Sequence, residues 1–82
     1  MYEIIFSDSA LKQLSKLEKN LQGRIIAALE RIRIRPEAYV KKLIGEPAYR
    51  LRVGDYRIIL DVDENKLLIL IIKIGHRSAI YK

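Results

Sequence analysis

The segment of residues 49–60 constrains the fold of this chain most, because it has the pattern of a β-hairpin. Gly54 and Asp55 separate two runs in which apolar and charged side chains alternate. A two-residue loop that begins with glycine is typical of the tight turns that join antiparallel strands. The segment therefore predicts two paired strands, Tyr49–Val53 and Tyr56–Val62.

The predicted pairing places three arginines on one face of the hairpin. Counting outward from the turn sets Arg52 opposite Arg57, and Arg50 lies two residues before Arg52 on the same side. Two directly opposed cations repel and destabilise a hairpin, whereas three forked guanidinium groups suit the binding of a phosphate or a carboxylate. Two alternatives stay open, an ordinary solvated strand face and a different register that removes the opposition.

Charge and composition limit the classes of function. The chain has 82 residues, a net charge of +6 and an isoelectric point near 9.8. We therefore expect one small domain, residues 1–82, that binds a polyanion, either nucleic acid or an acidic protein. The sequence has no cysteine, which excludes disulfides and thiolate metal sites and fits a reducing cytoplasm.

The sequence also indicates a cytoplasmic protein without membrane contact. The first residues lack the basic region and apolar run of a signal peptide. The longest apolar run, residues 67–72, is too short to span a bilayer.

The remaining segments predict a helical hairpin and two further strands. Apolar residues at helical spacing indicate one helix capped by Ser7 or Asp8 and a second helix from about Asn20 to Arg33. Strands are expected at Tyr2–Phe6 and Leu67–Ile74, and residues between the second helix and the hairpin are expected to be mostly irregular. The order β-α-α-β-β-β predicts an α+β fold in which the helical hairpin packs on one face of a mostly antiparallel sheet.

The last predicted strand, Leu67–Ile74, is apolar at every position except Lys73. Such a run is typical of a central strand that is covered on both faces. The two helices cover one face. For the other face, the long side chains of the hairpin and a partner chain over exposed apolar surface are both open alternatives.

Four further residues are candidates for a site beside the arginines. His76 follows the last strand, and histidine is the side chain that changes charge near neutral pH, so it suits proton transfer. Tyr81 can stack on a base or donate its hydroxyl. Lys41 and Lys42 are either ordinary surface charge or a pair that positions phosphate. The sequence has no glycine-rich phosphate loop and no metal-ligand spacing, so we expect no cofactor and no metal.

The chain resembles the RelE/ParE superfamily of bacterial and archaeal toxins. The resemblance rests on Leu43-Ile44-Gly45, on residues 49–58, on Gly75-His76-Arg77 followed by Tyr81, and on the opening residues 2–19. It covers essentially the whole chain and implies the RelE-like fold. RelE-like members are ribosome-dependent endoribonucleases, called mRNA interferases, that cut mRNA in the decoding site and are neutralised by an extended antitoxin.

The resemblance also implies roles for individual residues. Carried over by position, the basic strand residues of the family are Arg50 and Arg52, and its later functional residues are Arg57, Arg77 and Tyr81. Well-studied members have lysines at the two strand positions, one of them proposed as general base. Because arginine is not deprotonated in proteins, Arg52 is expected to stabilise charge, and His76 becomes the expected proton acceptor.

The resemblance predicts metal-independent cleavage of ribosome-bound mRNA by attack of the RNA 2′-hydroxyl, with the arginines stabilising the transition state. The expected partner is an acidic, extended, RelB-like antitoxin, and the expected assembly is a toxin–antitoxin hetero-oligomer. A ParE-like toxin, which shares the fold, inhibits DNA gyrase and is not a nuclease, is the alternative from another class. A basic module without chemistry is a third alternative, and the clustered arginines favour the nuclease.

Overall fold

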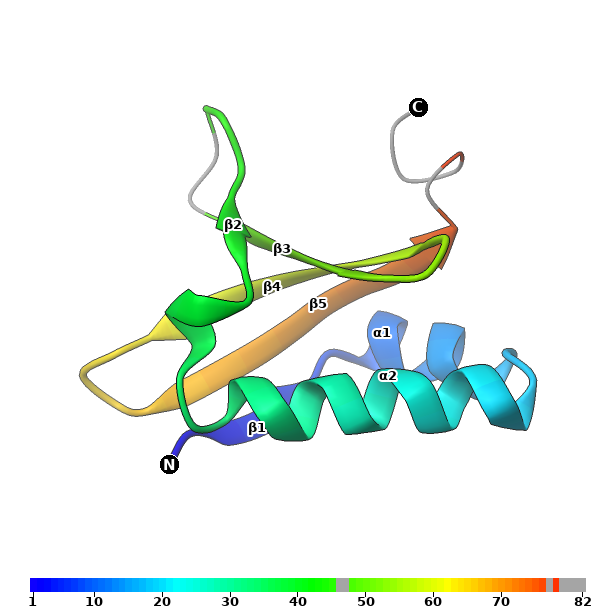
Figure 1. The fold of residues 1–82 in the computed structure, drawn as a ribbon, viewed down its shortest axis with the longest axis horizontal. Coiled ribbons are helices and arrows are strands. Elements are labelled where there is room, and N and C mark those ends of the chain that lie inside the picture. The colour runs from blue at the N-terminus through cyan, green and yellow to red at the C-terminus, as the bar shows by residue number, and fades with distance from the viewer. Residues whose placement is uncertain (46–47, 77, 79–82) are drawn as a thin grey trace.

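The computed structural model describes residues 1–45, 48–76 and 78. Both helices lie on one face of a five-stranded sheet, and the other face carries no helix of the described chain (Figure 1). The elements are β1 (Glu3–Phe6), α1 (Asp8–Ser15), α2 (Lys19–Ile32), the 3-10 helix η1 (Pro36–Ala38), β2 (Lys41–Lys42), β3 (Tyr49–Val53), β4 (Tyr56–Asp63) and β5 (Leu68–His76). The predicted α+β fold is confirmed, and the short strand β2 is an addition in a region expected to be irregular.

The sheet has the strand order β1-β5-β4-β3-β2. Strand β1 runs parallel to β5, whereas the other three pairs of neighbours are antiparallel. Strand β5 is therefore an interior strand with β1 on one side and β4 on the other, as its apolar run predicted. No second layer of the described chain covers its other face.

The β3–β4 hairpin has the register predicted from its turn, with Val53 opposite Tyr56 and Arg52 opposite Arg57. Gly54 adopts φ +60°, a left-handed conformation that glycine reaches without the steric cost of a side chain. This conformation at the first loop position matches the twist of the two strands, so the local sequence alone sets the pairing.

The core fills the space between the sheet and the helices. It consists of the buried apolar residues Ala10, Leu14, Ile25, Ala28, Leu29, Ile32, Leu51, Val53, Ile58, Leu60, Ile69, Ile71 and Ile74. Ser7 begins α1, because its extended backbone precedes the helix and its hydroxyl accepts a hydrogen bond from the Ala10 N–H at 3.0 Å. Of the two expected caps, Ser7 is therefore the one used.

Strand β5 changes its pattern of burial at a β-bulge. The pairing with β4 shifts between Ile59 and Leu60, so that Ile72 is an extra residue in β5. Ile71 and Ile74 are buried, whereas Ile72 and Lys73 are both exposed. The apolar run is therefore not covered on both faces within the described chain, which corrects that expectation. The bulge instead moves a lysine to the face away from the helices.

Two side chains hold the outer edge of β5 beside the bulge. Strand β1 ends at Phe6, and beyond it this edge faces α1. The Ser7 hydroxyl donates to the carbonyl of Ile72 at 2.8 Å, and the Gln13 side-chain carbonyl accepts from the backbone N–H of Ile74 at 2.7 Å. These two bonds take the place of a neighbouring strand and keep the bulged backbone paired.

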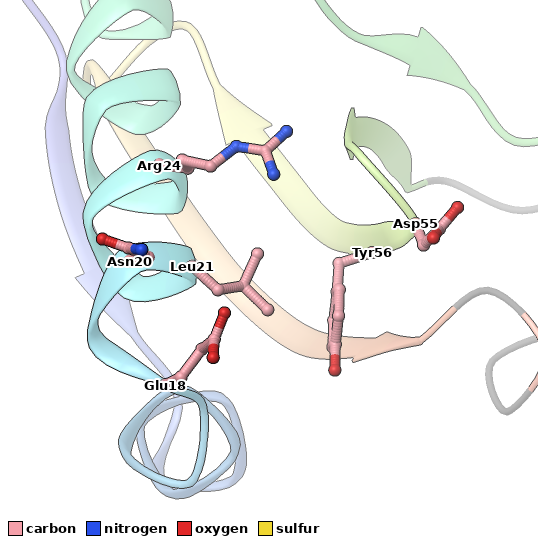
Figure 2. A pocket seen from close by; sticks show the side chains of 6 residues that line it. All are labelled: Glu18, Asn20, Leu21, Arg24, Asp55 and Tyr56. Carbon is pink, nitrogen blue, oxygen red and sulfur yellow. The ribbon is translucent and has the colours of Figure 1, made fainter.

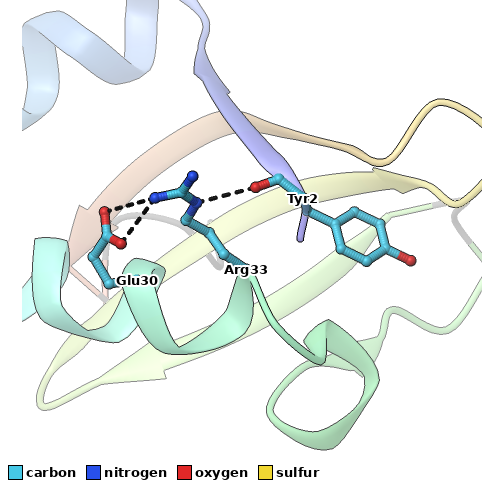
Figure 3. A network of polar contacts seen from close by, with 3 residues as sticks. All are labelled: Tyr2, Glu30 and Arg33. Carbon is cyan, nitrogen blue, oxygen red and sulfur yellow. Dashed lines mark hydrogen bonds and ion pairs between the residues drawn. The ribbon is translucent and has the colours of Figure 1, made fainter.

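A polar network joins the start of the chain to the end of α2 (Figure 3). The Tyr2 N–H donates to the Arg33 carbonyl at 2.8 Å, and Arg33 Nε donates to the Tyr2 carbonyl at 3.0 Å. Arg33 Nη1 also pairs with the Glu30 carboxylate at 3.0 Å. The network fixes where β1 enters the sheet.

Candidate nucleic-acid interface

The face of the sheet away from the helices, here called the open face, carries a row of cations that runs across four strands. The register sets Lys41 of β2 opposite Arg50 of β3, Arg50 opposite Ile59 of β4, and Ile59 opposite Lys73 of β5. Neighbouring strands lie about 4.8 Å apart, so the row spans about 14 Å. It offers three cationic groups around one apolar side chain.

A second row lies two residues nearer the hairpin turn and contains Arg52, Arg57 and Gly75. The spacing along the strands puts it about 7 Å from the first row. Arg52 is exposed and its Nε donates to the Gly54 carbonyl at 3.4 Å. Gly75 has no side chain, so the surface beside Arg57 stays open on the β5 side.

The guanidinium of Arg57 lies deeper than that of Arg52. Arg57 is half-buried, and its Nε and Nη1 atoms are covered. A charge in such a partly covered place acts through a lower effective dielectric than an exposed one. Arg57 therefore suits a fixed electrostatic role, and exposed Arg52 suits the first contact with an anion.

The cations are confined to the half of the open face near the hairpin turn. In the other half, Asp61 lies opposite Leu70, and Leu70 lies opposite Ile5 of β1. Leu70 and Ile5 keep 40% and 43% of their surface exposed, and the next row sets Asp63 and Glu3 on either side of Leu68, so this half combines apolar side chains with three acidic residues. The open face thus has a cationic half suited to phosphate and a half whose exposed apolar side chains suit a protein side chain.

Two of the predicted site residues are not brought together with these arginines. Lys42 pairs with Tyr49, and His76 pairs with Tyr56, so strand alternation directs both away from the open face. The ring of His76 packs edge-on against Tyr56 with the centroids 5.4 Å apart, and its Nδ1 accepts from the Ser78 N–H at 3.3 Å.

The predicted residues Arg77 and Tyr81 lie outside the described part of the chain. Conversely, the structure adds Lys73, which sequence reasoning did not assign to the site. A lysine that interrupts an apolar strand was the available signal, but its face depends on the bulge, which the local pattern does not reveal.

On the helix side of the hairpin lies a pocket of about 420 Å³, separate from the open face (Figure 2). Its lining residues are Glu18, Asn20, Leu21, Arg24, Asp55 and Tyr56. Two carboxylates among six residues make it a poor site for a phosphate. The described chain contains no group of three potential metal-ligating side chains, and none of its helices is long and apolar enough to cross a bilayer.

Known proteins with a similar sequence and fold are toxins. The model of the family described as "ParE toxin of type II toxin-antitoxin system, parDE" matches residues 4–81. The mRNA interferase toxin RelE of Escherichia coli (strain K12) is 28% identical over 85 residues, covering 98% of this chain and 90% of that protein.

Solved structures agree with these matches. In the intact E. coli RelBE toxin-antitoxin complex, the similar chain has 27% identity and a TM-score of 0.82, with 93% of this chain and 96% of that chain covered. In the archaeal RelE-RelB complex from Pyrococcus horikoshii the identity is 30% and the TM-score 0.81, with 94% and 96% covered. The chain therefore belongs to the ParE toxin family of type II toxin-antitoxin systems and is a RelE/ParE superfamily toxin of the RelE-like type.

Proposed function

We propose that this toxin is a ribosome-dependent endoribonuclease that cleaves mRNA at the cationic half of the open face. The observation that carries the proposal is the direct opposition of Arg52 and Arg57, flanked by Lys41, Arg50 and Lys73. Opposed like charges weaken a hairpin, and a phosphate bound between them relieves the repulsion. The relatives named mRNA interferase RelE support RNA as the source of that phosphate.

The proposed reaction uses a nucleophile that the substrate carries. The 2′-hydroxyl oxygen attacks the adjacent phosphorus, the bond from phosphorus to the 5′-oxygen breaks, and the products are a 2′,3′-cyclic phosphate and a 5′-hydroxyl. Arg52 and Arg57 stabilise the additional negative charge that develops on the phosphoryl oxygens in the transition state. Exposed Arg52 can donate two parallel hydrogen bonds, and half-buried Arg57 supplies a fixed positive charge beside it. No metal ion is required by this scheme.

Proton transfer completes the proposed reaction: water accepts the proton that the 2′-hydroxyl loses, and water supplies the proton that the 5′-oxygen gains. Arginine does not serve as the acceptor. The placement of His76 beside Tyr56, on the other side of the sheet from Arg57, argues against its contact with the same phosphate. The resemblance to the superfamily supplies Arg77 and Tyr81 as further proposed catalytic residues.

The proposed partners are ribosome-bound mRNA and an acidic, extended, RelB-like antitoxin, in the cytoplasm. Solved RelB-RelE complexes of similar toxins support the antitoxin. The open face supplies both chemical features that such a partner needs, since cations lie in one half and exposed apolar side chains in the other. Binding of the antitoxin over this face would cover the apolar run of β5.

The experiment that tests the proposal incubates the pure toxin with programmed ribosomes and maps mRNA cleavage by primer extension. Wild-type protein should cut the mRNA. Arg57→Ala should cut it about 100-fold more slowly or worse, the usual effect of removing one charge-stabilising donor. Lys66→Ala is the matched control, because it removes one exposed cation from the β4–β5 turn.

A parallel incubation with gyrase and relaxed plasmid separates the two toxin classes. The family match carries the ParE name, so gyrase inhibition is the second candidate function. Wild-type protein that leaves mRNA intact and blocks supercoiling would replace the nuclease proposal by this one. Cleavage by Arg57→Ala at the wild-type rate would refute the assignment of the site.

A further inference from the structure

A second cluster of arginines lies between α2 and the outer edge of β3, on the helix side of the hairpin. A groove of about 320 Å³ separates these two elements. Its lining consists of Arg24, Ala27, Ala28, Arg31, Arg52, Val53 and Gly54. Three of the described lining residues are arginines and none is acidic, which distinguishes this groove from the neighbouring pocket with two carboxylates.

The three arginines converge on the groove from different elements. Arg24 and Arg31 are seven residues apart on α2, so they lie on the same helix face about 10.5 Å apart along the axis. Arg24 also reaches the hairpin turn, because its Nη2 would be 3.2 Å from a Cβ placed on Gly54. Arg52 Nε donates to the Gly54 carbonyl, so two guanidinium groups meet at this residue.

The two arginines that α2 contributes to the groove are held in no ion pair within the described chain. Neither Arg24 nor Arg31 forms an ion pair with another described residue. Figure 2 shows the Arg24 side chain extended from α2 toward the hairpin and apart from Glu18, and Arg24 lines the adjacent pocket together with Glu18 and Asp55. Unbalanced cations that share a groove repel one another, and a bound polyanion removes that repulsion.

We propose that this groove binds the phosphodiester backbone of RNA, as a second contact apart from the strand on the open face. The proposal rests on the proposed function for the identity of the polyanion as RNA. Arg24 and Arg31 are far enough apart along α2 for their guanidinium groups to contact different phosphates of one RNA strand. Arg52 belongs to both surfaces, so the basic surface continues around the edge of β3.

The lining favours a nucleic-acid backbone over an acidic peptide. Its other described members are Ala27, Ala28, Val53 and Gly54, and Val53 is buried. A peptide that docks in a groove is normally anchored by large apolar side chains in pockets, and this lining provides none. A phosphate backbone is held by charge and by forked guanidinium donors.

The test measures binding of a short 2′-O-methyl oligoribonucleotide, whose blocked 2′-hydroxyls prevent cleavage, by fluorescence anisotropy at a series of salt concentrations. The variant is Arg24→Gln/Arg31→Gln, and glutamine keeps the helix propensity near that of arginine. The matched control is Lys12→Gln/Lys16→Gln, which removes two exposed cations beside or within α1. Circular dichroism verifies that each variant is folded.

The groove variant should reduce the slope of log affinity against log salt by about 1.4, since each lost phosphate contact on a single strand contributes about 0.7. The lysine control should keep a slope near that of the wild type. Equal reductions in the two variants would overturn the proposal, because they would indicate a general effect of net charge. Selective loss of poly-glutamate binding would also overturn it and assign the groove to an acidic protein.

Cleavage of ribosome-bound mRNA by the wild type tests the proposed function separately. If the wild type cleaves mRNA and the groove variant has the same salt slope as the lysine control, the groove proposal alone is refuted. If the wild type does not cleave mRNA and the salt slope of the groove variant falls by the expected amount, the nuclease proposal is refuted and the groove remains an RNA-binding site.

Discussion

Replacing Gln13 by alanine removes the acceptor of the Ile74 backbone N–H, which Gln13 holds at 2.7 Å. Ile74 is only 2% exposed, so water does not replace the lost acceptor easily. A buried donor left unsatisfied costs about 1–3 kcal/mol. Alanine returns a few tenths of a kcal/mol through its higher helix propensity in α1. The expected net loss of stability is therefore about 1–2.5 kcal/mol.

The assay is thermal unfolding followed by circular dichroism. For a domain of this size 1 kcal/mol shifts Tm by about 4–8 °C, so Gln13→Ala should melt roughly 4–20 °C below the wild type. Hydrogen exchange adds a local readout, because the Ile74 amide should lose protection more than the amides in the centre of β4.

Two variants serve as controls for this prediction. Gln13→Glu keeps an oxygen acceptor at the same place and should stay within about 0.5 kcal/mol of the wild type at neutral pH. Lys12→Ala makes an exposed substitution at the preceding position of α1 and should have a similarly small effect. If Gln13→Ala melted together with Lys12→Ala, the bond from Gln13 to β5 would not support the bulge, and the reasoning would fail.

Three further predictions concern His76, the turn residue Leu67 and the tyrosine that precedes β1, Tyr2. His76→Ala should cleave mRNA at close to the wild-type rate, because His76 is directed away from the open face; a loss of about 100-fold, typical of general acid–base catalysis, would contradict this. Leu67→Gly should raise the urea midpoint by the equivalent of about 0.5 kcal/mol, because Leu67 has φ 54° and glycine removes that strain. Desolvation, followed by Glu64 and Glu37, raises the pKa of Tyr2 above 10.0. The folded state therefore favours the neutral phenol, so stability should decline as the pH rises past 10, and absorbance titration against Tyr2→Phe should show this.

The parts of the structure that could be predicted from the sequence are set by residues that lie close together along the chain. The turn at Gly54 and the alternation on both sides of it determine the β3–β4 register, so the opposition of Arg52 and Arg57 followed directly. The cap by Ser7 and the burial stripe of α2 are local in the same sense. These features need only dihedral preferences and periodicity.

The bulge in β5 could not be predicted in this way. Its bonds come from Ser7 and Gln13, and Gln13 lies 61 residues from its partner Ile74. The face of the sheet on which Lys73 and His76 lie depends on this bulge, because one inserted residue moves every later side chain of the strand to the opposite face. Local periodicity therefore placed Arg50, Arg52 and Arg57 on one face of the hairpin, as the register has them, but it did not reveal that Lys73 shares this face or that His76 does not.

Deletion of Ile72 tests this dependence directly. Without the extra residue, Lys73 follows Ile71 directly, so plain alternation keeps Lys73 on the open face and Ile74 in the core. The deletion variant should therefore fold with an uninterrupted pairing of β4 and β5. It loses the hydrogen bond that the Ile72 carbonyl accepts from Ser7, which should cost about 1 kcal/mol. Ile72→Ala keeps the residue count and truncates a side chain that is 37% exposed, so it should fold with a loss of roughly 1 kcal/mol or less. A deletion variant that does not fold, while Ile72→Ala melts near the wild type, would show that plain alternation cannot place Lys73 and Ile74 and that the bulge itself is required.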